Sequence, residues 1–171
     1  IQGTKDSKIP TDGSVTTIGS NAFADARGLT TITIPEGITT INGSAFTGCN
    51  NLANISLPST LETVNRRALY STALTEITFP VSVSYIGNNC TIYSRKLKSV
   101  TILNPYAQID GEADTFYGDV TIRGYTGSTA EGLSSQNAEQ RLLKNGKNKL
   151  QESKGKSIFA RFLEQIADPM I

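Results

Sequence analysis

Apolar residues recur at a spacing of 22 or 23 along residues 15–131, and the polar residues between them keep the same order. The ten residues 32–41 contain an Ile-Thr-Ile triplet, a proline and a second Ile-x-x-Ile pattern, and close copies follow at residues 55–64 and 77–86. Alternation of apolar and polar residues predicts a half-buried strand. Each copy therefore predicts two short strands separated by a corner, and a unit repeated at this spacing is typical of a solenoid.

Three series of apolar residues run through the repeats, and we expect all three to point into the core. They comprise Ile18, Ile41, Val64, Ile86 and Ile109; Leu29, Leu52, Leu74 and Leu97; and the pairs Ile32/Ile34, Ile55/Leu57, Ile77/Phe79 and Val100/Ile102. Burying one such side chain stabilises a fold by about 1.5–3 kcal/mol. No repeat can cover these residues alone, so neighbouring repeats must stack. We predict a mainly-β solenoid of about five repeats, with short irregular or helical segments between the strands.

The corners of the predicted coil contain small or conformationally permissive residues. The first apolar series, from Ile18 to Ile109, marks what we call the isoleucine-type position of each repeat. A left-handed turn is expected directly after it, at Gly19, Asn42, Asn65, Gly87 and Asp110. One inward-facing series of small residues comprises Ala22, Ala45, Ala68, Cys90 and Ala113, and a second comprises Ala26, Cys49, Ser71 and Ser94. The two cysteines thus lie two repeats apart in different series. Because adjacent strands are about 4.8 Å apart, we expect two buried free thiols rather than a disulfide.

Polar residues alternate with the buried residues of each first strand and are expected to face solvent. On stacked repeats they would form a ladder of hydroxyl and amide groups, which favours a broad, shallow contact surface for a protein or a glycan. Threonine also suits the solvated side of a sheet by propensity alone, so a purely structural role is the alternative. The candidate binding residues are Thr31, Thr33, Asn54, Ser56, Glu76, Thr78, Ser99 and Thr101. Outward-facing residues on the second strands include Thr17, Thr40, Thr63 and Tyr85.

Composition argues against several functional classes. The chain has no histidine, the usual general base and a common metal ligand, and its formal charge of +1 gives no reason to expect a nucleic-acid partner. We expect no enzyme activity, no cofactor and no metal site, and no apolar run is long enough to span a bilayer. A basic set could form a patch, although ordinary solubilising charge is the simpler interpretation: Arg66, Arg67, Arg95, Lys96 and Lys98. An acidic set without a calcium-loop pattern comprises Asp110, Glu112, Asp114 and Asp119.

The repeat landmarks point to a known family. The segments VTTIGSNAFADARGLTTITIP and ITTINGSAFTGCNNLANISLP, with two looser successors, resemble the BspA-like class of 23-residue leucine-rich repeats over residues 15–131. Residues 124–131 are similar to the usual end of such arrays. The resemblance implies a solenoid that is exported and that adheres to host proteins.

Composition changes after Glu131 towards Ala, Leu, Gln, Glu and Lys, which predicts a helical extension of two helices. Ser134 suits a helix N-cap and Gly146 suits a helix end, so the first helix is expected between them. Ser157 is expected to begin the second helix. The apolar face of this second helix comprises Ile158, Phe162 and Ile166. A simple cap on the last repeat is one role for such helices.

Residues 132–171 also resemble the cytoplasmic N-terminal segment of calcium-type P-type ATPases. The matching residues are Gly132-Leu133-Ser134, Ala138, Arg141-Leu142, Gly146, Asn148, Leu150, Phe162-Leu163, Gln165 and Asp168-Pro169. The positions that depart from the usual pattern are Asn137, Lys147 and Ile166. The Asp-Lys-Thr-Gly phosphorylation motif of that family is absent, so the resemblance implies a regulatory or structural segment. Membrane attachment would then involve only residues beyond Ile171.

Two functional hypotheses follow. The first is a non-enzymatic interaction module that binds a protein or a glycan through the solenoid surface. The alternative is an accessory regulatory domain of a membrane calcium pump, truncated before its first membrane helix. They imply different locations, the cell surface or medium for the first and the cytoplasmic face of a membrane for the second.

We expect three regions, an irregular lead-in at 1–14, the solenoid at 15–131 and the tail at 132–171. A start at Ile1 without a signal peptide suggests a fragment or processed product.

Overall fold

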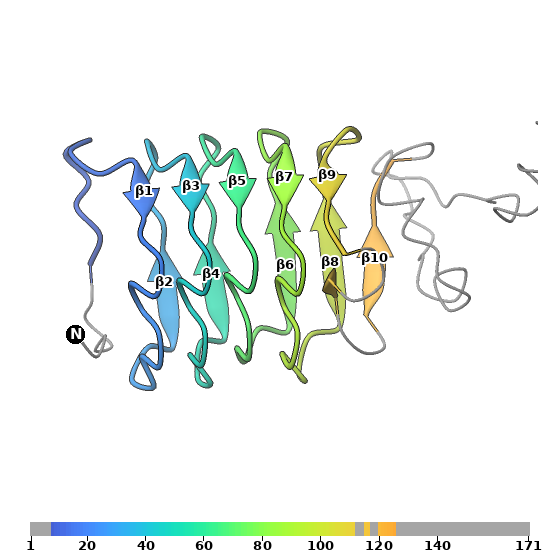
Figure 1. The fold of residues 1–171 in the computed structure, drawn as a ribbon, viewed down its shortest axis with the longest axis horizontal. Helices are drawn as coiled ribbons and strands as arrows, with labels where there is room; N and C mark the ends of the chain where they lie inside the picture. The colour runs from blue at the N-terminus through green and yellow to red at the C-terminus, as the bar shows by residue number, and fades with distance from the viewer. Residues whose placement is uncertain (1–7, 112–114, 117–119, 126–171) are drawn as a thin grey trace, which may run out of the picture.

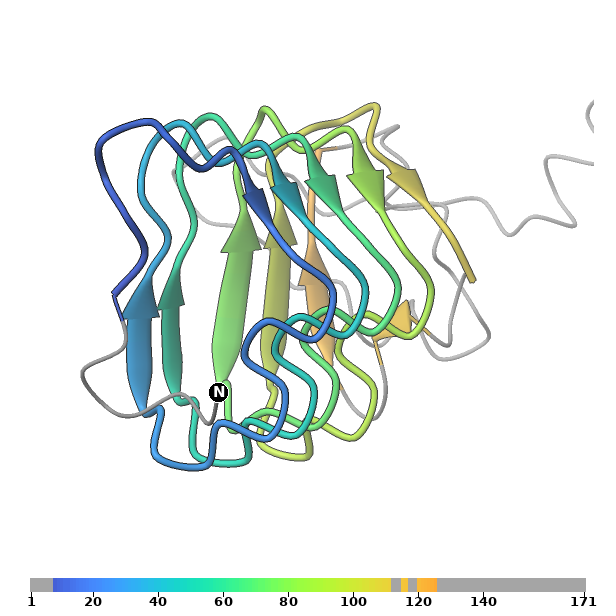
Figure 2. The ribbon, with the colours of Figure 1, turned by 60° about the vertical axis from the view of Figure 1, so that its left-hand side comes forward.

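The computed structural model describes residues 8–111, 115–116 and 120–125, and its strands lie in two columns (Figure 1). The first column holds the first strand of each predicted pair and contains β2 (Thr31–Thr33), β4 (Asn54–Ser56), β6 (Glu76–Phe79), β8 (Ser99–Ile102) and β10 (Thr121–Arg123). The second column holds the second strands and contains β1 (Thr17–Ile18), β3 (Thr40–Ile41), β5 (Thr63–Val64), β7 (Tyr85–Ile86) and β9 (Gln108–Ile109). The chain alternates between the columns as it advances, which is the winding of a solenoid (Figure 2). The predicted helical extension lies outside the described residues.

Except at β4 and β6, consecutive strands of each column pair in parallel, one turn apart along the chain. Ile41 lies opposite Ile18 on one side and Val64 on the other, and Ile86 continues the same row. Further backbone hydrogen bonds join the corners, such as those from the Phe23 N–H to the Ala45 carbonyl and from the Phe46 N–H to the Ala68 carbonyl, both 2.8 Å. The described residues form about four turns, where about five repeats were predicted. The mainly-β solenoid is confirmed.

The core consists of the predicted apolar series stacked along the solenoid axis. Ile41, Leu52 and Phe46 are among its fully buried side chains. The rings of Phe46 and Phe23 stack with centroids 5.0 Å apart and planes inclined by 6°. Phe23 belongs to the first coil and is only half-buried, because it has a neighbouring coil on one side only. Ile9, from the predicted lead-in, is buried and contributes to the same core.

The second column is continuous, whereas the first is interrupted between β4 and β6. β2 and β4 form a two-stranded sheet, and β6, β8 and β10 form a separate three-stranded sheet. The wider spacing between β4 and β6 is visible in Figures 1 and 2. Ile55 and Leu57 beside the break are half-buried, unlike Ile32 and Ile77 at the position equivalent to Ile55.

The break coincides with a coil that is one residue shorter than its neighbours. The missing residue lies just before Leu74, because Thr72 occupies the buried position of Cys49 and Ser94 in the adjacent coils. The hydroxyls of Thr72 and Ser94 are 2.9 Å apart, and the Thr72 N–H donates to Ser94 Oγ at 3.1 Å. The prediction that Ser71 belongs to the inward small series was therefore wrong. Ser71 instead has a left-handed backbone with φ of 57°.

The left-handed corners also differ from the prediction. Positive φ falls not after the isoleucine-type residue but three and seven positions beyond it, at Asn21, Ser44, Arg67 and Asn89 and at Asp25, Gly48, Ser71 and Tyr93. Asparagine and glycine occur directly after the isoleucine-type position for another reason, which is that adjacent coils approach closely there. Asn65 Nδ2 donates to Asn42 Oδ1 at 3.1 Å, forming an asparagine ladder. Gly87 leaves room for the backbone of the preceding coil.

Substitution of Gly87 tests this close approach. A Cβ at Gly87 would lie 2.4 Å from the backbone nitrogen of Arg66 and 2.8 Å from the carbonyl carbon of Asn65, whereas a Cβ at the equivalent Gly19 meets nothing within 4 Å. We expect Gly87→Ala to lower the free energy of unfolding by about 1–3 kcal/mol, as overpacked sites do. Gly19→Ala is the matched control and should change it by less than about 0.5 kcal/mol. Urea titrations followed by circular dichroism measure both, and equal effects would contradict the proposed packing.

Candidate binding surface

The eight predicted binding residues lie on one side of the solenoid, on β2, β4, β6 and β8. Because β4 and β6 are not paired, they form two patches rather than one continuous ladder. In the first patch, Thr31 lies opposite Asn54 and Thr33 lies opposite Ser56. In the second patch, Glu76 lies opposite Ser99 and Thr78 lies opposite Thr101.

Six of the eight residues are exposed as predicted, and two are not. Ser99 retains only 9% of its surface, and Thr101 is half-buried. Both lie on β8, which has β6 on one side and β10 on the other, so neighbouring side chains cover its small residues from both directions. The expectation that Ser99 faces solvent was therefore wrong. The exposed candidates are Thr31, Thr33, Asn54, Ser56, Glu76 and Thr78.

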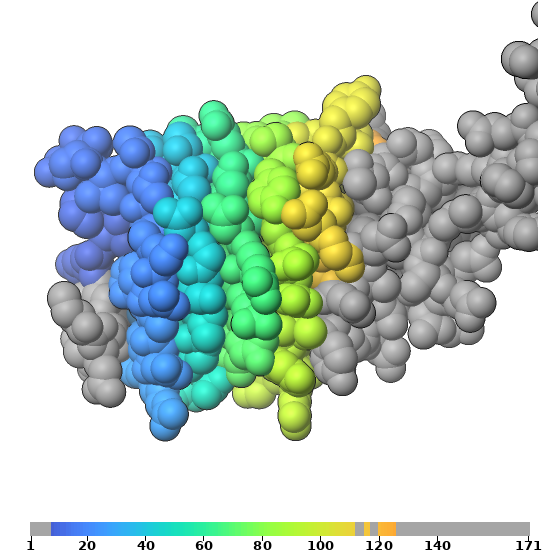
Figure 3. Space-filling model, in the orientation of Figure 1, coloured from blue at the N-terminus to red at the C-terminus, as the bar shows by residue number. Residues whose placement is uncertain are grey.

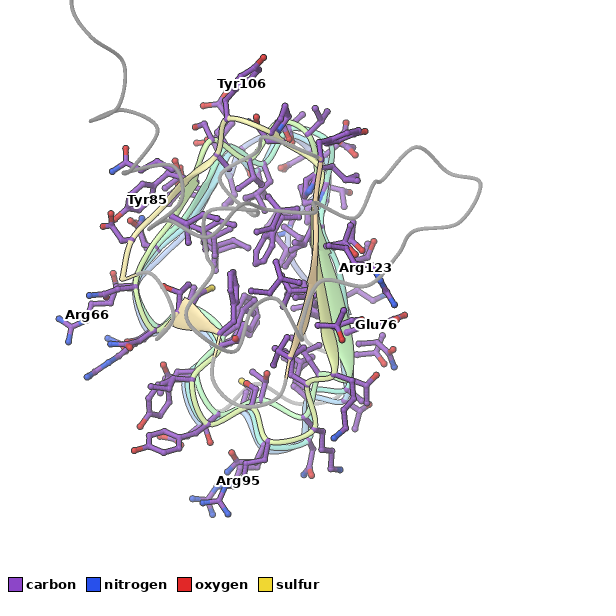
Figure 4. All side chains as sticks on the ribbon, turned by 90° about the vertical axis from the view of Figure 1, so that its right-hand side faces the viewer. Arg66, Glu76, Tyr85, Arg95, Tyr106 and Arg123 are labelled. Carbon is purple, nitrogen blue, oxygen red and sulfur yellow. The ribbon has the colours of Figure 1, made fainter. Side chains whose placement is uncertain are left out.

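β10 adds two residues to this side that were not among the candidates. Thr121 lies opposite Ser99, and Arg123 lies opposite Thr101, which gives the second patch a cation as well as the carboxylate of Glu76. Figure 4 shows Glu76 and Arg123 on the same side of the solenoid. The signal was present in the sequence, since Val120-Thr121-Ile122 alternates like the other first strands. The apolar pair Val120 and Ile122 begins fewer than 22 residues after the apolar pair of the preceding first strand, so a search for such pairs at the repeat spacing of 22 or 23 residues does not find it.

The polar groups of the exposed candidates are free to meet a partner. Within the described residues, none of the side chains of Thr31, Thr33, Asn54, Ser56, Glu76 and Thr78 makes a hydrogen bond or an ion pair. Each hydroxyl or amide therefore keeps both donor and acceptor capacity. Among these six residues only Glu76 is charged.

The last two strands of the second column, β7 and β9, use polar side chains internally. Tyr85 Oη donates to Asp110 Oδ2, and Gln108 Nε2 donates to Asp110 Oδ1 at 3.4 Å. The hydrogen bond to the Asp110 carboxylate, with a further contribution from burial, raises the pKa of Tyr85 above its ordinary value. The outward residues of β7 and β9 are thus less available to a partner than the exposed candidates of the first column.

The corner between the two columns is braced in a similar way. Glu36 accepts hydrogen bonds from the backbone N–H of Ser59 at 2.9 Å and from its hydroxyl at 3.0 Å. These bonds stabilise the charged carboxylate, and the backbone bond contributes most to lowering the pKa of Glu36. This carboxylate serves to join two coils.

The predicted charged sets do not form single patches. Arg66 and Arg95 project in different directions from the solenoid (Figure 4). Of the acidic set, only Asp110 belongs to the described residues, and it is bonded to Tyr85. Among the residues described, no group of three or more His, Cys, Asp or Glu side chains is placed to hold a metal ion. This part of the chain also contains no helix long and apolar enough to cross a membrane.

Cys49 and Cys90 are both buried and free, as predicted. Burial raises the pKa of the Cys49 thiol to about 11 and that of the Cys90 thiol to about 12. Cys49 Sγ also donates to the Phe23 carbonyl at 3.0 Å, which fixes it against the first coil. Both thiols act as small core residues.

The fold and its regular polar side define a leucine-rich repeat solenoid, and a family comparison makes the class specific. Residues 3–123 match the BspA type leucine rich repeat region in six copies. The chain belongs to this family. Residues 119–171 match a second family, the N-terminus of cation transporters and ATPases. The two matches share residues 119–123, which include β10, whereas the sequence analysis placed the change of composition at Glu131.

Solved structures with the same fold come from bacterial repeat proteins. The T. pallidum leucine-rich repeat protein TpLRR is 27% identical, with a TM-score of 0.61 over 67% of this chain and 56% of that protein's chain. The pneumococcal vaccine antigen PcpA is 25% identical, with a TM-score of 0.57 over 70% of this chain and 36% of that chain. This chain thus spans about half or less of either relative. No match is found among curated proteins.

The buried thiols give a direct test of core packing. Thiolates, not thiols, attack disulfide reagents, and pKa values of about 11 and about 12 leave almost no thiolate at about pH 8. We expect neither cysteine of the folded chain to react with Ellman's reagent within minutes, and both to react once urea unfolds it. Rapid reaction of one thiol in the absence of urea would contradict burial of that residue.

Proposed function

We propose that the chain is a non-enzymatic binding module that engages a protein partner through the first-strand side of the solenoid. The supporting observation is the set of exposed hydroxyl, amide and carboxylate side chains without partners in the described residues: Thr31, Thr33, Asn54, Ser56, Glu76 and Thr78. Within each patch, paired parallel strands lie about 4.8 Å apart, so the spacing of the residues in a patch is fixed before binding. A partner does not have to order them, which reduces the entropic cost of association.

The chemistry of this side favours many weak polar contacts over one deep anchor. The exposed candidates offer five neutral polar side chains and one carboxylate, and no large apolar residue interrupts them. A partner with its own regular row of backbone or side-chain polar groups would match that arrangement. Similarity to PcpA, which is described as a vaccine antigen, supports a role at a bacterial surface, and a host protein is then the proposed partner class.

Lysine substitutions on the two patches test this proposal. We expect Thr33→Lys with Thr78→Lys to weaken binding to purified extracellular-matrix glycoproteins at least tenfold, because each lysine places a bulky charge in a neutral contact. Surface plasmon resonance on immobilised matrix proteins measures the effect. Thr17→Lys on β1 is the matched control, exposed on the other column and expected to bind as the unmodified chain does.

All three threonines are exposed, so their substitution should leave stability within about 0.5 kcal/mol. Unchanged binding by the double variant would mean that another side of the solenoid meets the partner. An equal loss in the Thr17→Lys control would indicate a general charge effect instead of a local contact. Either result would overturn the proposed site.

A second candidate function has one specific observation in its favour. The match of residues 119–171 to the N-terminus of cation transporters and ATPases supports an accessory regulatory domain on a calcium-transporting pump. In that arrangement the solenoid would lie on the cytoplasmic side of a membrane, and its partner would be cellular.

The gene tests this alternative directly. If the chain is part of a pump, the reading frame beyond the codon for Ile171 should encode an apolar run of about 20 residues, the length that spans a bilayer. Deletion of the repeats from that full-length protein should then change the calcium dependence of ATP hydrolysis in membrane vesicles. A stop codon directly after Ile171, or an unaltered calcium dependence, would contradict the regulatory role.

A further inference from the structure

An open pocket of about 380 Å³ lies at the corner that follows β5, away from the binding side proposed above. It is lined by Asn50, Tyr70, Ser71, Thr72, Ala73, Tyr93, Arg95 and Lys96. These residues come from three consecutive coils. Because ligand pockets usually measure about 300–1,000 Å³, the space suits one or two sugar-sized rings and not a folded partner.

The pocket has a structural cause in the short coil. The corner around Thr72 and Ala73 lacks one residue, so it is set back while the corners of the two adjacent coils extend past it. Figure 3 shows the lower edge of the array recessed below β5 relative to the band below β7. Thr72 and Ala73, each with 5% of its surface exposed, therefore form a small-residue floor. The floor is fixed by the bonds of Thr72 to Ser94.

Two tyrosines form an aromatic wall. The rings of Tyr70 and Tyr93 meet edge to face, with centroids 5.3 Å apart and an interplanar angle of 79°. The guanidinium of Arg67 lies 5.7 Å from the centre of the Tyr70 ring, which braces that ring with a cation–π contact. Tyr93 has 46% of its surface exposed. Part of an aromatic ring therefore borders the pocket, and such rings present apolar surface for packing.

The rim of the pocket is cationic and rich in hydrogen-bonding groups. Arg95 and Lys96 are exposed, and the pocket-lining residues include no Asp or Glu. Ser71 Oγ donates to Asn50 Oδ1 at 3.0 Å, which leaves the Asn50 Nδ2 group as a donor. A planar guanidinium binds a carboxylate with two parallel hydrogen bonds. The rim thus has the groups that hold a carboxylate beside a polyhydroxylated ring.

We infer that this pocket binds a terminal acidic sugar, a pyranose that carries a carboxylate. Arg95 and Lys96 neutralise the carboxylate, a tyrosine ring packs on the C–H face of the pyranose, and Asn50 donates to its hydroxyls. An acidic peptide fits less well, because Ala73 is the only aliphatic side chain in the lining. A peptide's apolar side chains would therefore find little to pack against. This site is independent of the protein-binding side proposed above.

Nuclear magnetic resonance titration of the full chain tests the inference. N-acetylneuraminic acid and glucuronic acid are the probes, and neutral N-acetylglucosamine is the reference ligand. We expect both acidic sugars to shift the backbone amide signals of Ser71, Thr72 and Ala73, and N-acetylglucosamine to leave them in place. Because the attraction involves exposed charges, added salt should weaken the binding.

Variants separate this pocket from general positive charge. We expect Arg95→Gln to weaken binding of the acidic sugars at least tenfold. Arg66→Gln removes the same charge from an exposed residue outside the pocket and should leave binding unchanged. Both residues project into solvent (Figure 4), so both variants should fold normally, as circular dichroism will report.

Three outcomes would overturn the inference. The first is the absence of amide shifts with either acidic sugar, and the second is equal binding of N-acetylglucosamine. The third is tighter binding of an oligoglutamate peptide than of the sugars, which would reassign the pocket to acidic peptides. Loss of matrix-protein binding on its own would concern only the other side of the solenoid.

Discussion

The structure depends on one constraint, that a coil of 22 or 23 residues can cover its apolar side chains only with the next coil. Parallel backbone pairing fixes the distance between coils, and the rows from Ile18 to Ile109 and from Phe23 to Leu69 fill the space between them. Side-chain hydrogen bonds between coils, such as the bond between Asn42 and Asn65, also run along the solenoid axis. Stability is therefore additive along the axis, and the first coil, covered on one side only, retains a half-buried Phe23.

Repetition made the stack predictable from sequence, because the spacing of apolar residues along the chain is also the spacing of contacts between coils. Local backbone details were less accessible. Glycine and asparagine suit both a left-handed turn and a close approach of two backbones, so residue type alone assigned the wrong cause at Gly87. The sequence also shows that one coil lacks a residue, but the missing residue could lie at any of several positions in the corner. In the structure, the burial and hydrogen bonds of Thr72 and the positive φ of Ser71 show that the gap falls after Thr72.

The candidate surface was predictable in outline but not in extent. Alternation identified the outward residues of β2, β4 and β6 correctly. Exposure, however, depends on what lies on both sides of a strand, and the sequence does not show that β10 covers Ser99. The corner pocket was harder still to find, because its lining comes from three coils. Tyr70 and Tyr93 occupy different positions of their repeats, so no periodic series contains both.

The short coil has a consequence for how such arrays diversify. The coil that is one residue shorter keeps the strand register of the continuous column, since Val64 pairs with Ile86. At the same coil the other column is interrupted and one corner is set back. In a repetitive scaffold, small insertions and deletions thus become a source of new surface shape that spares the core. In this chain the coil of different length is thus also the coil that forms the floor of the corner pocket.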